Sequence, residues 1–277
     1  MAIYHFDLAP VRRSAGQTST GAAAYQSGTR LQDSRTGILY NFRRKAPGVV
    51  ASGLEGWPGD RGSLWNAAEA AERRKDGVPG RRIILALPAE LDEAASIRLV
   101  RDFAARVAQR HGIAVDWAIH RPDTHGDSRN THAHILLSSR RVEGDRLGPK
   151  AREFDDRQEG PKTLSLLRED WADLVNEALG RAGVLARVDH RRRRDREPME
   201  HLGPAASALE RRGIRTARGG RNRRKRLSRI RPDLAPVSVE TTSERIAGML
   251  ETKTRRLVRP VQRTLERTAQ ILLEDER

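Results

Sequence analysis

The sequence predicts an α+β fold: a central antiparallel sheet that carries a His-x-His strand, with helices packed on one side, followed by a basic segment and a helical C-terminal tail. Strand-like and helix-like runs are interspersed without the regular βαβ cycles of a parallel sheet. The runs VDWAIH (115–120) and THAHILLSS (131–139) are joined by a segment long enough to return the chain antiparallel. The 277 residues, 37% of them hydrophobic, are enough to bury a core.

The N-terminal part is expected to form a strand and two helices. Residues 2–7 alternate with the period of a short strand. The run GAAAYQSGTR favours helix because of its alanines, with Ser19 or Thr20 as the N-cap, so that Tyr25 projects from an early turn. Ser63 is the expected N-cap of the next helix, LWNAAEAAERR, which ends before residues 78–80.

The rest of the chain continues with strands, helices and a separate tail. Residues 83–88 predict a buried strand, a helix follows from Asp92 to near Gly112, and residues 162–183 predict a further helix. Pro232 and Pro236 mark a linker before a long amphipathic pattern that Pro260 should kink or break. We therefore expect a domain of residues 1–225, a linker of residues 226–240 and a helical extension of residues 241–277. That extension either mediates association with itself or a partner, or packs back on the domain.

Composition excludes several classes of protein. The absence of cysteine excludes disulfide scaffolds, zinc fingers, iron–sulfur clusters and cysteine nucleophiles. No apolar run is long enough to span a membrane, and the start of the chain lacks the order of a signal peptide. We expect a soluble, cytoplasmic protein without membrane insertion. The formal net charge of +16 points to a polyanionic partner, with nucleic acid the leading candidate.

Most of the excess positive charge lies in one segment. Residues 187–231 contain 17 Arg and Lys against 5 Asp and Glu. Like charges at this density repel one another unless phosphates lie between them, and the planar guanidinium of arginine suits phosphate oxygens. The alternative is a solvated face or a disordered tail. The candidate DNA-binding residues are Arg191, Arg192, Arg193, Arg194, Arg221, Arg223, Arg224, Lys225 and Arg226.

Three histidines are candidate metal ligands. His132 and His134 are two residues apart in a strand-like run, so both imidazoles share one face of the sheet. His120 ends the preceding strand and should lie beside them. Three neutral imidazoles with open positions suit Mn²⁺ or Mg²⁺ acting as a Lewis acid on a phosphodiester. Two alternatives are histidines that only form hydrogen bonds and a zinc hydrolase, which the apolar residues after His134 disfavour.

Tyr25 is a candidate nucleophile. It follows Gly21 and three alanines, and these small residues would let a DNA backbone approach its hydroxyl. A phenol needs a polarised phosphorus and nearby cations to react at neutral pH, and the histidines and arginines could supply both. The competing interpretation is an ordinary core or surface aromatic residue.

The chain resembles a known family through several motifs that occur in order. These are IYHFDLAPVRRSAGQTSTGAAAYQSGTRL, AIHRPDTHGDSRNTHAHILLSSR, RVDHR and HLGP. They resemble the MobA/MobL relaxases, DNA-nicking enzymes of conjugative plasmids in the HUH class, over residues 1–225. The resemblance implies that Tyr25 is the catalytic tyrosine and that His120, His132 and His134 are the metal ligands. The order and spacing of the motifs together are specific, whereas each motif alone is weak.

The chain also departs from this family. Relaxases of the family often carry acidic residues in the strand that ends in ALP, where this chain has Arg82, Ile83 and Ile84. Asp123 and Asp127 are candidates for the missing carboxylate, although both also fit ordinary turn chemistry. His125 is similarly ambiguous. Asp189, His190, His201 and Gly203 lie in family-like segments whose spacing assigns them no role.

The resemblance implies a reaction and its partners. The expected reaction is metal-dependent nicking of one DNA strand at a plasmid transfer origin, giving a 5′-phosphotyrosyl intermediate, followed by rejoining of the transferred strand. The expected partners are single-stranded DNA at that origin, relaxosome accessory proteins and a secretion coupling protein, in the bacterial cytoplasm or carried with the DNA to a recipient cell. The alternatives are a non-catalytic basic nucleic-acid-binding protein, a metal phosphodiesterase that activates water, and an HUH replication initiator.

Overall fold

The computed structural model describes residues 4–122, 130–191, 199–200 and 202–230. The chain forms two compact units, Met1–Arg191 and Arg192–Arg277. The strands of the first unit are β1 (Phe6–Val11), β2 (Arg30–Gln32), β3 (Leu39–Asn41), β4 (Val49–Glu55), β5 (Gly80–Ala86), β6 (Ile113–His120), β7 (His132–Glu143) and β8 (Arg146–Lys150). Its helices are α1 (Ser19–Ser27), α2 (Arg61–Ala71), α3 (Glu93–His111) and α4 (Glu159–Arg181), with short 3-10 turns at Arg13–Ala15, Arg43–Gly48 and Arg152–Phe154.

The central sheet is antiparallel, as predicted, and it carries the His-x-His strand. Its strand order is β1-β5-β7-β6-β4, with β8 pairing with β7. The short strands β2 and β3 form a separate antiparallel hairpin. Because β7 begins at His132 and lies between β5 and β6, the histidines stand at one end of the sheet's central strands.

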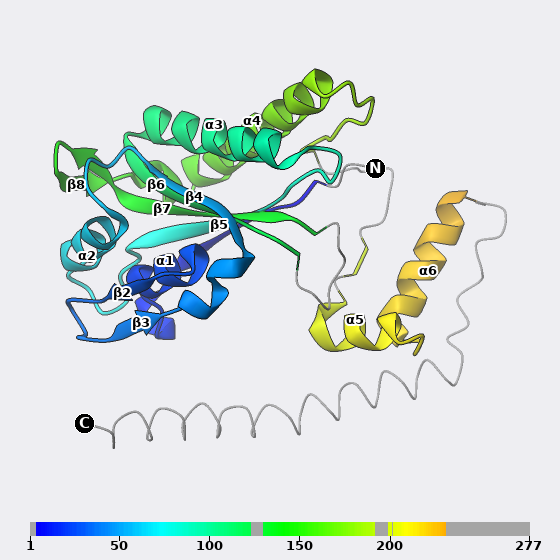
Figure 1. The fold of residues 1–277 in the computed structure, drawn as a ribbon, viewed down its shortest axis with the longest axis horizontal. Coiled ribbons are helices and arrows are strands. Elements are labelled where there is room, and N and C mark those ends of the chain that lie inside the picture. The colour runs from blue at the N-terminus through cyan, green and yellow to red at the C-terminus, as the bar shows by residue number, and fades with distance from the viewer. Residues whose placement is uncertain (1–3, 123–129, 192–198, 201, 231–277) are drawn as a thin grey trace, which may run out of the picture. The chain divides into compact units, whose positions relative to one another are not determined.

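Helices cover both faces of the sheet, so the prediction of helices on one side is wrong. Helices α3 and α4 lie on one face, and α1 and α2 lie on the other (Figure 1). The first face packs Phe103 against Trp171, whose rings are 5.3 Å apart, and the second packs Trp65 with Leu136. Residues 113–119 of β6 are buried throughout, and a strand covered on both faces requires such a nearly continuous apolar run.

The four helices predicted in the first unit are present, with corrections to their first residues. Asp92 caps α3 by accepting from the Ala95 N–H, and Gly112 ends that helix with a φ of 59°, as expected. Thr18, not Ser19 or Thr20, caps α1 by accepting from the Gly21 N–H at 2.9 Å. Asp60, not Ser63, caps α2.

Several strand boundaries differ from the prediction, and four strands were not predicted. The first strand was expected at residues 2–7 but β1 covers Phe6–Val11, and the strand expected at 83–88 begins at Gly80. The four strands without a predicted counterpart are β2, β3, β4 and β8.

The second unit contains two helices among the residues that are described. They are α5 (Gly203–Arg211) and α6 (Ala217–Ile230). Helix α6 extends through residues 226–230, so the predicted linker of residues 226–240 does not begin at 226. The boundary between the units lies inside the predicted domain of residues 1–225. The helical extension predicted for residues 241–277 lies outside the described residues. Among the described residues, no helix combines the length and the hydropathy needed to cross a membrane.

Candidate metal centre and nucleophile

The strand register brings the three predicted histidines together. His120 of β6 pairs directly with His132 of β7, and His134 lies two residues further along the same face. The ring centroids are 5.4 Å apart for His120 and His132, 4.5 Å for His120 and His134, and 5.0 Å for His132 and His134. One ligand nitrogen from each ring lies within 4.8 Å of the others, which is a spacing that a single metal ion can bridge.

Backbone carbonyls orient two of these rings. The carbonyl oxygen of Gln26 lies 2.6 Å from Nε2 of His120, and that of Asn130 lies 2.9 Å from Nδ1 of His132. A carbonyl only accepts, so each of these ring nitrogens carries the proton and donates it. Nδ1 of His120 and Nε2 of His132 are therefore left with free lone pairs, which is how proteins orient imidazoles toward a metal.

The electrostatic environment keeps His120 and His134 neutral. Burial lowers the pKa of His134 to about 3, with further lowering by the neighbouring histidines and by Arg82 and Lys45. Burial also lowers the pKa of His120, against a smaller opposing effect of its hydrogen bond to Gln26. Because metal ligation requires the unprotonated nitrogen, both rings are ready to bind a cation at neutral pH without first losing a proton.

Tyr25 presents its ring at the surface of α1. The residue is 42% exposed, whereas Ala23 and Ala24 beside it are fully buried and hold the helix against the fold. The Tyr25 ring packs edge-on against Phe42, with centroids 5.3 Å apart. Lys45 donates a hydrogen bond from Nζ to the Tyr25 hydroxyl at 3.1 Å. The hydroxyl is thus both accessible and next to a cation.

The helix that carries Tyr25 is fixed to the strand that carries His120. Gln26 follows Tyr25 directly and makes two hydrogen bonds to β6. Its backbone carbonyl accepts from Nε2 of His120, and its side-chain amide donates to the backbone carbonyl of Asp116 at 3.1 Å. At the other end of α1, the backbone N–H and hydroxyl of Ser19 donate to Oε1 of buried Glu69 at 2.6 and 2.8 Å. The structure therefore places the candidate nucleophile and His120 on two elements, α1 and β6, that are hydrogen-bonded to each other.

Lys45 lies at this site, although no pattern in the sequence predicts it there. It lies in the 3-10 turn Arg43–Gly48, and its positive charge contributes to the lowered pKa of both His120 and His134. The cluster Arg43-Arg44-Lys45 is visible in the sequence, but no spacing rule connects it with a tyrosine 20 residues earlier. Only the turn after β3 brings the two side chains together.

No carboxylate belongs to the histidine group in the part of the chain that the structure describes. Ile84, which lies in the strand where the resemblance leads us to expect a carboxylate, pairs directly with His134 across β5 and β7. The two candidates for that carboxylate, Asp123 and Asp127, lie outside the described residues, as does His125.

The predicted DNA-binding residues fall into three groups. Arg192, Arg193 and Arg194 lie outside the described residues, as does His201. Arg191 pairs with Asp189 at 3.0 Å. In the second unit, Arg221 and Lys225 pair with Glu200, at 2.7 and 3.8 Å, and Arg223 pairs with Glu210. Arg224 and Arg226 also lie on α6.

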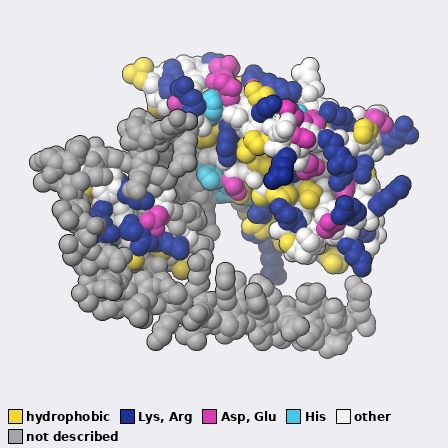
Figure 2. All heavy atoms as spheres, turned by 180° about the vertical axis from the view of Figure 1, so that it is seen from behind, with side chains coloured by type: hydrophobic (Ala, Val, Ile, Leu, Met, Phe, Trp, Pro, Cys, Tyr) yellow, Lys and Arg dark blue, Asp and Glu magenta, His cyan; other side chains and the backbone are white. Residues whose placement is uncertain are grey.

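Positive charge is not confined to the basic segment. On the face shown in Figure 2, Lys and Arg side chains are spread over the first unit among Asp and Glu side chains. The first unit therefore carries exposed cations of its own, apart from those of α6.

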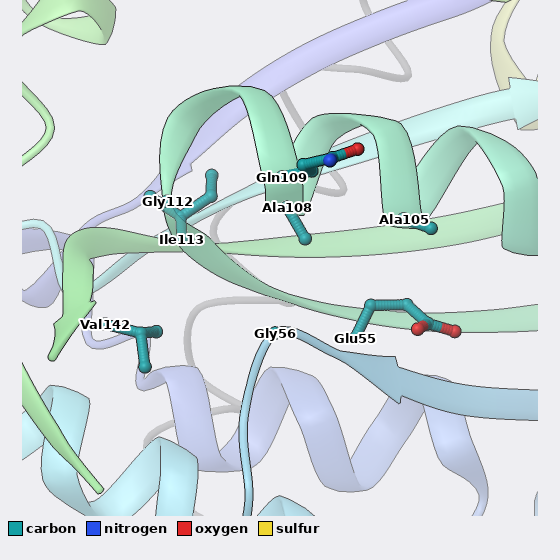
Figure 3. A pocket seen from close by; sticks show the side chains of 8 residues that line it. All are labelled: Glu55, Gly56, Ala105, Ala108, Gln109, Gly112, Ile113 and Val142. Atoms are coloured by element: carbon teal, nitrogen blue, oxygen red, sulfur yellow. The ribbon is translucent and has the colours of Figure 1, made fainter. Parts of the chain in front are cut away.

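A pocket that is open to solvent lies away from the histidines. It has a volume of about 380 Å³ and lies between α3 and the adjoining strands (Figure 3). Its lining is Glu55, Gly56, Ala105, Ala108, Gln109, Gly112, Ile113 and Val142. Because this lining includes neither a histidine nor Tyr25, we assign the candidate site to the open sheet end and not to this cavity.

Comparisons with known proteins identify the family of the chain. The model of the MobA/MobL family matches residues 17–212. Mobilization protein MobL of Acidithiobacillus ferridurans is 39% identical over 76% of this chain and 65% of its own length. The probable mobilization protein MobA of Bifidobacterium longum is 30% identical over 82% of this chain and 48% of its own length. The chain thus spans less than two thirds of either relative.

A solved structure is also similar. It is described as the molecular basis of vancomycin resistance transfer in Staphylococcus aureus, and it is 26% identical with a TM-score of 0.60, covering 69% of this chain and 100% of that one. The family match covers most of the chain and includes Tyr25 and all three histidines. The motifs that suggested this resemblance are therefore carried by a matching fold, and the chain belongs to the MobA/MobL family.

Proposed function

We propose that the protein is a conjugative relaxase that nicks one strand of DNA at a plasmid transfer origin. The observation that carries the proposal is the convergence of three imidazoles, two of them with lowered pKa, beside the helix that presents an exposed tyrosine. Membership of the MobA/MobL family and the similarity to proteins named as mobilization proteins support it.

The proposed nucleophile is the hydroxyl oxygen of Tyr25. A divalent cation, Mn²⁺ or Mg²⁺, held by His120, His132 and His134 would supply Lewis-acid polarisation of the scissile phosphate. The Tyr25 oxygen forms a bond to phosphorus while the bond from phosphorus to the 3′ oxygen breaks, leaving a 5′-phosphotyrosyl link and a free 3′ hydroxyl. Attack by the 3′ hydroxyl reverses the step, and the strand is rejoined without an external energy source.

The proposed substrate is single-stranded DNA at the origin, bound mainly through its phosphates. Arg191–Arg194 and the cations of α6 are the proposed contacts in the basic segment. Arg221, Arg223 and Lys225 would exchange their carboxylate partners Glu200 and Glu210 for phosphate oxygens. Relaxosome accessory proteins and a secretion coupling protein remain proposed partners.

A cleavage assay tests the proposal. Single-stranded oligonucleotides that span a candidate transfer origin are incubated with the protein and Mn²⁺ or Mg²⁺, or with EDTA, and separated on a denaturing gel. We expect a protein–DNA band that requires metal and is absent in Tyr25→Phe. Tyr40→Phe is the matched control, since it removes a hydroxyl from the neighbouring hairpin strand β3 and should still form the band.

Two other results would contradict the proposal. Metal-dependent cutting without a covalent band would indicate water as the nucleophile. Binding to the origin without cutting would indicate a non-catalytic nucleic-acid-binding protein.

A further inference from the structure

We propose that Lys45 is a catalytic residue of the Tyr25 reaction, whose ammonium group stabilises the negative charge on the phenol oxygen as that oxygen attacks phosphorus and later leaves it. This inference rests on the proposed function, because it concerns the same reacting oxygen. The role, stabilising charge on the phenol oxygen, is one that we assign neither to the histidines nor to the basic segment.

The contact involves the reacting atom itself. Nζ of Lys45 lies 3.1 Å from the Tyr25 oxygen and 4.2 Å from the centroid of its ring. An ammonium group has only donors, so the phenol oxygen accepts from it and turns its own proton elsewhere. A charged donor stabilises an oxygen that carries negative charge more than it stabilises a neutral hydroxyl. The interaction is therefore stronger when the phenol oxygen is ionised.

The position of Lys45 is built into the fold. A Cβ added at Gly28, which ends α1 with a φ of 63°, would collide with the backbone of Ala46, so the turn rests directly on the end of the Tyr25 helix. The N–H of Lys45 donates to the Phe42 carbonyl at 2.8 Å, and the N–H of Phe42 donates to the Thr29 carbonyl at 2.9 Å. The turn is thereby hydrogen-bonded to Thr29, which follows the Gly28 cap of α1.

The charge balance of the reaction gives Lys45 the same task in both directions. In cleavage, the phenol proton passes to solvent water, to which Tyr25 is open, and the departing 3′ oxygen takes a proton from water. In rejoining, phosphorus–oxygen bond cleavage returns negative charge to the phenol oxygen. Lys45 keeps its own protons throughout, so its removal should slow both directions.

Single-turnover kinetics of covalent adduct formation test this proposal in the chain of residues 1–277. Lys45→Ala is expected to lower the rate by about 10²-fold, which is the typical effect of losing one charge-stabilising donor. Lys45→Arg should recover part of the loss. Arg44→Ala is the matched control, because it removes the same charge from the same exposed turn and should keep the wild-type rate.

Two further measurements separate a catalytic role from a structural or DNA-binding role. Lys45→Ala and Arg44→Ala should weaken binding to the uncleaved oligonucleotide equally, as measured by fluorescence anisotropy at one salt concentration. Ethylammonium chloride should raise the rate of Lys45→Ala above that of a potassium chloride control, whereas it should leave Tyr25→Phe inactive.

The outcomes distinguish the two proposals. If wild type forms the adduct and Lys45→Ala forms it as fast as Arg44→Ala, the role of Lys45 is overturned and that of Tyr25 stands. If ethylammonium gives no rescue and Lys45→Arg is as slow as Lys45→Ala, the charge-stabilising role is also overturned. If wild type forms no adduct on a cognate origin, the proposed function fails, and the role of Lys45 fails with it.

Discussion

His134 couples the candidate metal centre to the stability of the metal-free protein. Its folded pKa of about 3 lies below the value of 6.5 for an unperturbed histidine. Between these values the unfolded chain binds a proton that the folded chain does not, so stability falls as pH falls below 6.5. One such group changes the free energy of unfolding by about 1.4 kcal/mol per pH unit.

We therefore expect His134→Gln to make stability less dependent on pH. Urea denaturation at pH 5 and pH 7 in EDTA should give a smaller difference between the two pH values for His134→Gln than for wild type. His5→Gln, which changes an exposed histidine, should behave as wild type does. Equal pH dependence in wild type and His134→Gln would contradict the lowered pKa of His134.

Ile84 offers a gain-of-function test of the same centre. It pairs directly with His134, and directly paired residues on antiparallel strands point to the same face. Ile84→Glu should add a carboxylate, which is a preferred ligand of Mn²⁺, and tighten Mn²⁺ binding by about 10-fold or more in calorimetry. The neutral Ile84→Gln is the control, and equal affinities in the two variants would contradict the placement of the centre.

At the scale of elements, the hydrogen bonds that join the start of α1 to Glu69 of α2 hold the helix that carries Tyr25 in place. Glu69 of α2 is 1% exposed, accepts from Ser19 at the start of α1, and pairs with Arg13 at 2.7 Å and with Arg35. Removing one charge of a buried pair leaves the other uncompensated. The position of the nucleophile thus depends on a carboxylate that lies far from it in the sequence.

We expect Glu69→Gln to lower the free energy of unfolding by about 3 kcal/mol, as measured by urea denaturation. It should also slow adduct formation, because α1 loses the partner of its first turn. Glu177→Gln, which breaks an exposed pair with Arg181 on α4, should cost less than about 1 kcal/mol. Similar losses in the two variants would show that Glu69 is not a structural anchor.

The elements that the sequence predicted are those with long, regular patterns. Helix α3 has both an Asp cap and a Gly end, β6 is apolar except at Asp116 and its final His120, and β7 carries the apolar run 135–137 directly after the histidines. Strand β4 was not predicted because Gly53 interrupts its strand-like pattern. The structure explains this glycine, since a Cβ at position 53 would collide with the indole of Trp117. The three-residue strands β2 and β3 are too short to show a period.

The candidate site was predictable in part for the same reason. The period of a strand places His132 and His134 on one face, and antiparallel return brings His120 beside them. By contrast, the contact between Lys45 and Tyr25 depends on a hairpin and a 3-10 turn that have no sequence period. The nearly continuous apolar sequence of β6 already indicated that helices cover both faces of the sheet. A strand covered on one face only would alternate apolar and polar residues.

At the scale of the whole molecule, the net charge of +16 would govern how the protein meets the proposed DNA substrate. Each phosphate neutralised on a single strand contributes about 0.7 to the slope of log affinity against log salt concentration. We expect affinity for single-stranded oligonucleotides to fall steeply between 50 and 200 mM salt, which are typical test concentrations. Fluorescence anisotropy measures this slope, and an affinity independent of salt would contradict phosphate-dominated binding.

The central claim is that Tyr25 becomes covalently attached to DNA, and mass spectrometry of the digested adduct tests it most directly. Trypsin cleavage after Arg13 and Arg30 releases a peptide of residues 14–30 in which Tyr25 is the only tyrosine. After reaction with an origin oligonucleotide and nuclease trimming, this peptide should carry the mass of a 5′-phosphorylated nucleotide on Tyr25. A nucleotide on a peptide containing Tyr4 or Tyr40, or DNA cut at the origin with no modified peptide, would contradict the account.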